Sequence, residues 1–283
     1  MKIRLLARDS KMPNVAIMKI STYHKQKGDD VDWYNPLFDR YNTDILYESK
    51  LFDFTGNYLY YPDCTIYKGG TGYNIEQKLP KEIDDIKILD YSLYPDCDYS
   101  IQFFSRGCIR NCSFCVVRKK EGYIQDQEPF ELNPKGKYIE ILDNNFFANP
   151  NWQKHAQYIK ELNQPVNFQG ADVRLMNKEQ CDFINEIKLK KQIHVAWDFP
   201  KQNMIPIFEN VLQWIKPYKL MCYVLIGYGS TPEEDLYRVE ELRKIKIDPF
   251  AMPYDKKNEY QKRFARWVNH KAIFRKVKWE EYK

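Results

Sequence analysis

Three cysteines, Cys108, Cys112 and Cys115, lie within eight residues and are separated by three and then two residues. Thiols this close in sequence indicate a metal-ligand set, because a disulfide would pair two of them and leave the third over. A structural zinc site needs four ligands and usually draws on a second Cys/His pair. The remaining cysteines are scattered singly, at positions 64, 97, 181 and 222. A [4Fe-4S] cluster held by three thiolates fits better, and it leaves one iron open to a substrate.

The spacing Cys-x-x-x-Cys-x-x-Cys, with the aromatic Phe114 before the last cysteine, resembles the signature of the radical S-adenosylmethionine (radical SAM) enzymes. The resemblance implies that SAM chelates the open iron through its amino and carboxylate groups. One electron from the cluster, supplied by a reductant such as flavodoxin or ferredoxin, would then cleave SAM to a 5′-deoxyadenosyl radical that abstracts hydrogen. A zinc loop and a chance group of buried thiols are the alternatives.

Length and composition agree with a cytoplasmic α/β protein. The 283 residues suit one α/β barrel with a smaller partner domain. Hydrophobic residues make up 43% and charged residues 29% of the chain, and no apolar run approaches the ~20 residues of a membrane span. The start has no signal-peptide pattern. A net charge of +5 permits an anionic partner without requiring one.

Residues 1–90 predict a small α/β domain, with strands at 2–7, 44–47 and 64–67 and a helix at 13–27 that closes at Gly28. This layout, with Gly69 and Gly70, resembles the cobalamin-binding domain that precedes the barrel in one branch of radical SAM enzymes. The cobalt-ligating His loop, Asp-x-His-x-x-Gly, is missing. We therefore expect a reduced relative that binds no cobalamin. A tight turn explains the glycines, with a phosphate-binding loop as the alternative.

Residues 91–255 repeat a unit of an apolar strand, a loop and an amphipathic helix, which is typical of parallel β/α folds. A linker at 80–98 is expected to lead into them. The predicted strands are 99–104, 138–142, 166–170, 193–197, 221–226 and 248–252. Helices between them are predicted to begin at Asn149, which Pro150 follows, at Asn177 with Gln180 three residues on, and at Thr231 with Glu234 three residues on. Six such units form an open, partial (β/α)6 barrel in the radical SAM family, whereas eight close a full barrel. The cysteine motif follows the first strand, at the edge where parallel strands carry their functional loops.

Polar residues at the next two strand ends are candidates for holding SAM. Strand 138–142 is followed by Asp143, Asn144 and Asn145, where the family commonly has Gly-Gly-Glu in contact with the SAM amino group. Asp172 and Arg174 follow strand 166–170. If the extended backbone continues that far, alternation brings both to one face, and an Arg fork suits the SAM carboxylate. The alternatives are an Asx-rich turn and a simple ion pair at the rim.

The last three strand ends offer weaker candidates. Asp198 could hold the SAM ribose or a substrate, or cap the next turn. Leu225, Ile226 and Gly227 resemble the family's strand end that lies against the adenine, although a plain turn also explains the glycine. Met252 stands where family members offer adenine a backbone contact. No catalytic residue is identified.

The segment 256–283 is basic and aromatic. It either packs its aromatics on the barrel, which is favoured, or contributes to nucleic-acid binding. The open side of six strands favours a peptide or nucleic-acid substrate, although small-molecule members of the family are not distinguished. The alternative function is a non-catalytic iron-sulfur protein for electron transfer or structure, which would normally use four thiolates.

Overall fold

A four-stranded sheet of order β2-β1-β3-β4 forms the centre of the first part of the chain, and every strand pair in it is parallel. The structure, a computed structural model, describes residues 1–10 and 12–282. It divides the chain into a first unit, Met1–Ile101, Arg110–Gly122 and Glu128–Lys137, and a second unit, Gln102–Ile109, Tyr123–Gln127 and Tyr138–Lys283.

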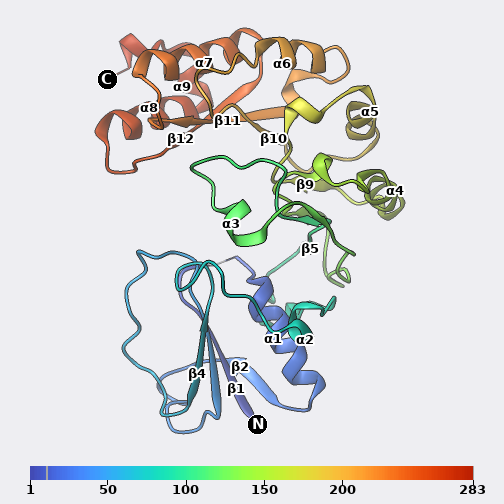
Figure 1. Cartoon of the computed structure of the whole chain (residues 1–283), viewed down its shortest axis with the longest axis vertical. Coiled ribbons are helices and arrows are strands. Elements are labelled where there is room, and N and C mark those ends of the chain that lie inside the picture. The colour runs from blue at the N-terminus through green and yellow to red at the C-terminus, as the bar shows by residue number, and fades with distance from the viewer. Residues whose placement is uncertain (11, 283) are drawn as a thin grey trace. The chain divides into compact units, whose positions relative to one another are not determined.

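The first unit is a helix-covered parallel sheet (Figure 1). Its elements are β1 (Lys2–Ala7), α1 (Val15–Gln26), β2 (Asp30–Trp33), β3 (Ile45–Ser49), β4 (Thr65–Gly69), α2 (Lys81–Asp84), η1 (Tyr91–Leu93) and α3 (Val117–Glu121). The side chain of Asn14 caps α1 by accepting from Ile17 N–H at 3.2 Å, and Gly28 follows its end with a φ of 81°. The strands and helix predicted in this region are confirmed.

Two features of the first unit differ from the prediction. Strand β2 was missed because it alternates acidic and apolar residues over only four positions, too short a pattern to recognise. The stretch 80–98 is not a linker. Its Ile83 and Leu93 are buried in one apolar cluster with Ile3 and Ile17, so it belongs to the core of the first unit.

Backbones approach closely where the glycines end β4. Gly70 has a φ of 97°, and a Cβ there would lie 2.4 Å from the carbonyl oxygen of Lys50. Lys50 N–H donates to Gly69 at 3.0 Å, and Gly72 N–H donates to Lys50 at 2.9 Å. The tight turn therefore explains Gly70, whereas a Cβ on Gly69 would meet nothing within 4 Å.

The second unit alternates strands and helices. Strand β5 (Ser100–Gln102) leads into it at Gln102. The elements that follow are β6 (Ser105–Arg106), β7 (Gln125–Asp126), β8 (Ile139–Ile141), η2 (Phe146–Ala148), α4 (Trp152–Leu162), β9 (Val166–Phe168), η3 (Val173–Leu175), α5 (Lys178–Glu186), β10 (Ile193–Ala196), α6 (Ile205–Val211), η4 (Pro217–Lys219), β11 (Leu220–Ile226), α7 (Pro232–Lys244), β12 (Asp248–Pro253), α8 (Glu259–Asn269), α9 (Lys271–Lys276) and η5 (Trp279–Glu281).

The six predicted strands are present and follow one another in space. They form two three-stranded sheets, β5-β8-β9 and β10-β11-β12, with parallel pairing of β8 with β9, β10 with β11 and β11 with β12. Ala171 N–H, just after β9, donates to the carbonyl of His194 on β10 at 3.0 Å. The chain is thus an α/β protein with parallel sheets, and the partial barrel remains a prediction.

Helix starts in the second unit follow local capping. Asn177 and Gln180 form the expected capping box of α5, and Thr231 and Glu234 form that of α7. The expected start of a helix at Asn149 is wrong by two residues, since α4 begins after Asn151. None of the helices described by the structure is long and apolar enough to cross a membrane.

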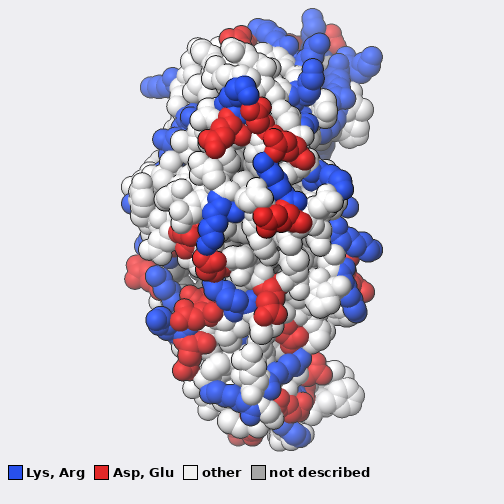
Figure 2. Space-filling model, turned by 90° about the vertical axis from the view of Figure 1, so that its right-hand side faces the viewer, with Lys and Arg blue, Asp and Glu red and all other residues white. Residues whose placement is uncertain are grey.

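The C-terminal segment buries its aromatic residues. Phe264, Trp267 and Phe274 belong to the main apolar cluster of the second unit and are at most 3% exposed, and α8 packs on β12. The basic residues Lys262 and Arg266 face outward, and Lys and Arg side chains gather at the upper end of the view in Figure 2. These three aromatic rings are therefore not available for stacking on bases.

Candidate active site

The base of the cysteine loop is a small antiparallel ladder. Strand β6 pairs with β7, with Ser105 opposite Asp126 and Arg106 opposite Gln125. Gln127 N–H extends the ladder by donating to the carbonyl of Phe104 at 2.9 Å. The loop that carries the cysteines leaves this ladder at Gly107, which has a φ of 84° that favours glycine. These two-residue strands were not predicted from the sequence.

Asp143 anchors the start of this ladder from the end of β8. Its carboxylate accepts from Phe104 N–H at 2.8 Å and from the Ser105 hydroxyl at 2.5 Å. The residue is only 2% exposed. Burial raises the pKa of Asp143 to about 7, although its hydrogen bonds act in the opposite direction. Asp143 therefore positions the cysteine loop through its own hydrogen bonds.

A second carboxylate, Asp126, holds the returning strand. It accepts from His155 Nε2 at 2.6 Å and from the amides of Asn149 and Asn151 at 2.8 and 2.9 Å. Burial opposes ionisation, but these hydrogen bonds keep the pKa of Asp126 below its ordinary value. Asn149 also donates to the carbonyl of Phe104 at 2.7 Å. Asp126, Asn149 and His155 were not predicted as site residues, and their sequence spacing gives no signal.

The cysteines themselves lie on irregular backbone. Cys108 and Cys112 are half-buried and Cys115 is exposed. Cys115 N–H donates to the carbonyl of Cys112 at 3.0 Å, in a turn that also contains the half-buried Phe114. Cys108 belongs to the second unit, whereas Cys112 and Cys115 belong to the first.

No three His, Cys, Asp or Glu side chains converge as a metal site within residues 1–10 and 12–282. The donor chemistry of the motif nevertheless fits an iron-sulfur cluster, because its ligands would be thiolates alone. The ligand set of Cys108, Cys112 and Cys115 remains a prediction.

The residues after β8 contact the ends of neighbouring segments. Asn144 is exposed, and its amide donates to the carbonyl of Gly107 at 3.4 Å. Asn145 is buried and accepts from Asp172 N–H at 3.2 Å. A Cβ on Gly170 would lie 2.6 Å from the carbonyl oxygen of Asn144, so a glycine is needed where the ends of β8 and β9 meet.

Asp172 and Arg174 bind each other. Arg174 Nε and Nη2 donate to the two oxygens of Asp172 at 2.6 and 3.0 Å. The expectation that an extended strand brings them to one face is wrong, because β9 ends at Phe168 and Arg174 lies in η3, which Asp172 caps. The Arg fork is therefore paired within the protein, and it also reaches the Gln202 amide oxygen at 3.3 Å.

The ends of β10 and β11 are tied together. Asp198 is half-buried; burial raises its pKa, while a hydrogen bond from the Leu225 backbone favours the ionised form. Leu225 and Ile226 are buried. Gly227 has a φ of 76°, and a Cβ there would lie 2.0 Å from the Gln261 side chain of α8. The positive φ therefore favours glycine here without any ligand.

An unpredicted ion pair supports these strand ends from α7. Arg238 and Asp235 are both fully buried, with 2.6 Å between Nη2 and Oδ1. Arg238 also donates to the carbonyls of Trp197 and Leu225, each at 2.9 Å. The sequence of α7 is rich in charged residues, which is typical of an exposed helix. The buried ion pair could therefore not be predicted from it. By contrast, Met252 on β12 is 43% exposed.

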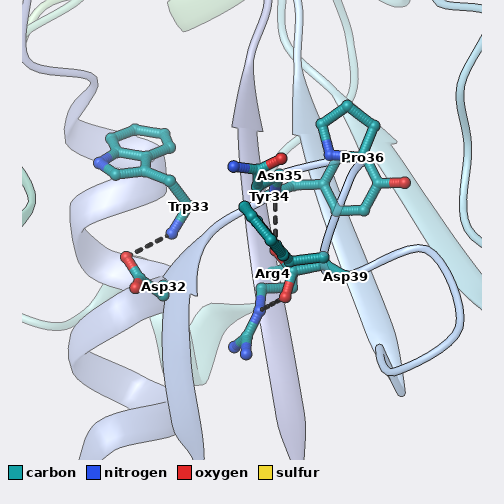
Figure 3. Close-up of a pocket in the computed structure, with 8 residues that line it drawn as sticks. Arg4, Asp32, Trp33, Tyr34, Asn35, Pro36 and Asp39 are labelled. Carbon is teal, nitrogen blue, oxygen red and sulfur yellow. Dashed lines mark hydrogen bonds and ion pairs between the residues drawn. The ribbon is translucent and has the colours of Figure 1, made fainter.

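A separate pocket of about 640 Å³ lies in the first unit beside β2 (Figure 3). Arg4, Trp33 and Asp39 are among the residues that line it. The Arg4 guanidinium is paired with Asp39 at 2.9 Å and with Asp30 at 3.1 Å. Arg4 is therefore already paired within the protein, and Asp32 adds a further carboxylate to the lining, so these groups do not favour an anionic ligand.

Comparison with known proteins gives one match to report. No family model matches the chain. The chain is 24% identical over 229 residues to the ribosomal protein uS12 methylthiotransferase RimO of Petrotoga mobilis. The match covers 68% of this chain and 51% of that protein. The chain thus spans about half the length of that protein. The similarity supports membership of the radical SAM superfamily, as the cysteine motif indicates.

Proposed function

We propose that the chain is a radical SAM enzyme that reductively cleaves SAM at a [4Fe-4S] cluster held by Cys108, Cys112 and Cys115. The observation that carries the proposal is the Cys-x-x-x-Cys-x-x-Cys loop, which comes after β5 and β6 in the chain. The distant similarity to a methylthiotransferase supports it. When bound, such a cluster would supply one electron to SAM and yield a 5′-deoxyadenosyl radical for hydrogen abstraction.

The residues at the strand ends would have two roles: some would hold the loops around the site, and others would contact SAM. Asp143 and Asn145 are buried and hydrogen-bonded to backbone, so we propose that they shape the site through the loops they hold. Asn144, Arg174 and Asp198 keep partial exposure and would contact the methionine and ribose parts of SAM. The remaining proposed contacts, which serve the adenine or line the site, are Phe114, Asp172, Leu225, Ile226, Gly227 and Met252.

Substrate and reductant are part of the same proposal. We propose that a cytoplasmic flavodoxin or ferredoxin reduces the cluster. The relative's name gives a ribosomal protein as its target, and we propose a macromolecular substrate here as well. We propose that the small α/β domain, residues 1–90, carries no cobalamin, that residues 91–255 contain the partial barrel, and that the segment 256–283 packs on this barrel.

Cluster analysis tests the ligand set. After anaerobic reconstitution, wild-type chain should hold about four iron and four sulfide ions, and Ala variants of Cys108, Cys112 or Cys115 should lose them. Variants of Cys64, Cys97, Cys181 and Cys222 serve as controls that keep the cluster. Addition of SAM should change the electron paramagnetic resonance spectrum of the reduced cluster, because an open iron accepts it. A spectrum that does not change when SAM is added would favour a non-catalytic iron-sulfur protein.

A further inference from the structure

Strands β8 and β9 have one apolar and one polar face. Ile139, Ile141, Val166 and Phe168 belong to the main apolar cluster. Successive side chains of a strand point to opposite faces, so Glu140, between Ile139 and Ile141, and the buried Asn167 lie on the other face. The two are also in register as neighbours on β8 and β9.

Glu140 is a buried carboxylate without a counter-ion. It is 4% exposed, and its oxygens accept from the Asn167 amide at 2.7 and 2.9 Å and from the Gln169 amide. No Lys, Arg or His forms an ion pair with it in the part of the chain that the structure describes. Two neutral amides do not balance a buried negative charge, which is costly to keep without a cation.

Two buried acceptors lie on the adjoining strands. Asn167 Oδ1 and His194 Nδ1 have no hydrogen-bond partner among the described residues, although Asn167 is fully buried and His194 is 7% exposed. Burial lowers the pKa of His194, while its hydrogen bond to the Phe168 backbone and the charge of Glu140 oppose this shift. Buried polar atoms nearly always have a partner, so these two call for a donor from outside the chain.

Aromatic rings continue the face across the next strands. The ring of His194 lies 5.1 Å from that of Tyr223 at an angle of 36°, and Tyr223 lies 5.6 Å from Phe250. Phe250 is 37% exposed. Aromatic faces attract cations and also cover the alkyl stem of a long side chain.

We propose that this face binds a guanidinium or primary ammonium group on an alkyl stem, supplied by an Arg or Lys side chain of a peptide substrate. The cation would pair with Glu140 and donate to Asn167 Oδ1 and His194 Nδ1. Its stem would lie along Tyr223, with the rest of the peptide over Phe250. The inference deepens the proposed function and rests on it for the chemistry, but the binding of the cation does not require SAM cleavage.

Calorimetry on the reconstituted chain, with the probes acetyl-Gly-Arg-Gly-amide and its citrulline counterpart, tests the charge requirement. We expect the arginine peptide to bind at least tenfold more tightly, because citrulline keeps the shape and loses the charge. Glu140→Gln should abolish this preference, whereas Glu209→Gln, an exposed position on α6, should retain it. Agmatine serves as the small-amine arm and should bind more weakly than the peptide.

Equal affinity for the arginine and citrulline peptides, or an arginine preference that survives in Glu140→Gln, would overturn the proposal. Agmatine binding as tightly as the peptide would overturn the peptide source. If Glu140→Gln does not fold, His194→Phe keeps the ring against Tyr223 and removes Nδ1, and several-fold weaker arginine binding is expected. If the chain binds the arginine probe but forms no 5′-deoxyadenosine, the proposed enzymatic function is refuted and the cation site is not. If it forms 5′-deoxyadenosine but does not bind the arginine probe, the cation site is refuted and the enzymatic function is not.

Discussion

Replacing Asp143 with Asn should make the stability of the protein less sensitive to pH. Burial raises the pKa of Asp143 from 3.8 to about 7. The folded state therefore binds this proton more tightly than the unfolded state does. The stabilisation from Asp143 is complete below the unfolded pKa and is lost as pH rises through the folded pKa. Wild-type protein should thus lose unfolding free energy from this group between about pH 4 and pH 7.

The magnitude follows from the two pKa values. Linkage gives a loss of about 1.7 kcal/mol at pH 5 and about 4.3 kcal/mol at pH 8, relative to the fully protonated group. The Asn variant has no such loss. Its side chain can still accept from Phe104 N–H and can donate to the Ser105 hydroxyl. The variant should therefore gain about 2.6 kcal/mol relative to wild type between pH 5 and pH 8.

Urea unfolding followed by circular dichroism, at both pH values, measures this difference. Asp255→Asn changes the same functional group at an exposed position and should follow wild type at both pH values. If Asp143→Asn and wild type keep a constant difference in unfolding free energy, Asp143 is not the buried, proton-binding anchor of the cysteine loop that its contacts indicate.

Two further substitutions and one binding measurement test other parts of the structure. Arg238→Met removes the cation from the fully buried Asp235, which keeps the hydrogen bond from the Tyr260 hydroxyl at 3.2 Å. The change should cost about 3–5 kcal/mol of unfolding free energy in urea titrations. A loss below about 1 kcal/mol would contradict the proposed role in holding β10 and β11. Arg174→Ala should weaken SAM binding in equilibrium dialysis by roughly 1.5–3 kcal/mol, and unchanged affinity would assign Arg174 to its ion pair with Asp172 alone. Hydroxocobalamin should be lost on desalting, since no Asp-x-His-x-x-Gly loop is present, and stoichiometric retention of the corrin would refute that expectation.

The sequence predicted the regular elements well where a pattern is local. Apolar strands recur between capped helices, so the six strands β5 and β8 to β12 and the capping boxes at Asn177 and Thr231 could be expected. Strand β2 and the pair β6 and β7 could not, because two to four residues carry no periodicity. The packing of Ile83 and Leu93 into the first core is a tertiary contact with no local signature.

The candidate site was predictable in position more than in detail. The strand ends could be found because polar residues follow apolar runs. The partners of those residues could not: Asp143 holds Ser105 from 38 positions away, and Arg238 reaches Trp197 from 41. An ion pair between Asp172 and Arg174 was one of the alternatives predicted from the sequence, and the structure contains it. The two residues do not share a strand, however, because β9 ends at Phe168.

The formation of 5′-deoxyadenosine tests the central claim most directly. Reconstituted wild-type chain, incubated anaerobically with SAM and dithionite, should produce 5′-deoxyadenosine and methionine in equal amounts, and Cys108→Ala should produce neither. Asp255→Asn should match wild type. A wild-type chain that holds a full cluster and binds SAM, yet yields no 5′-deoxyadenosine above the Cys108→Ala background, would contradict the assignment as a radical SAM enzyme.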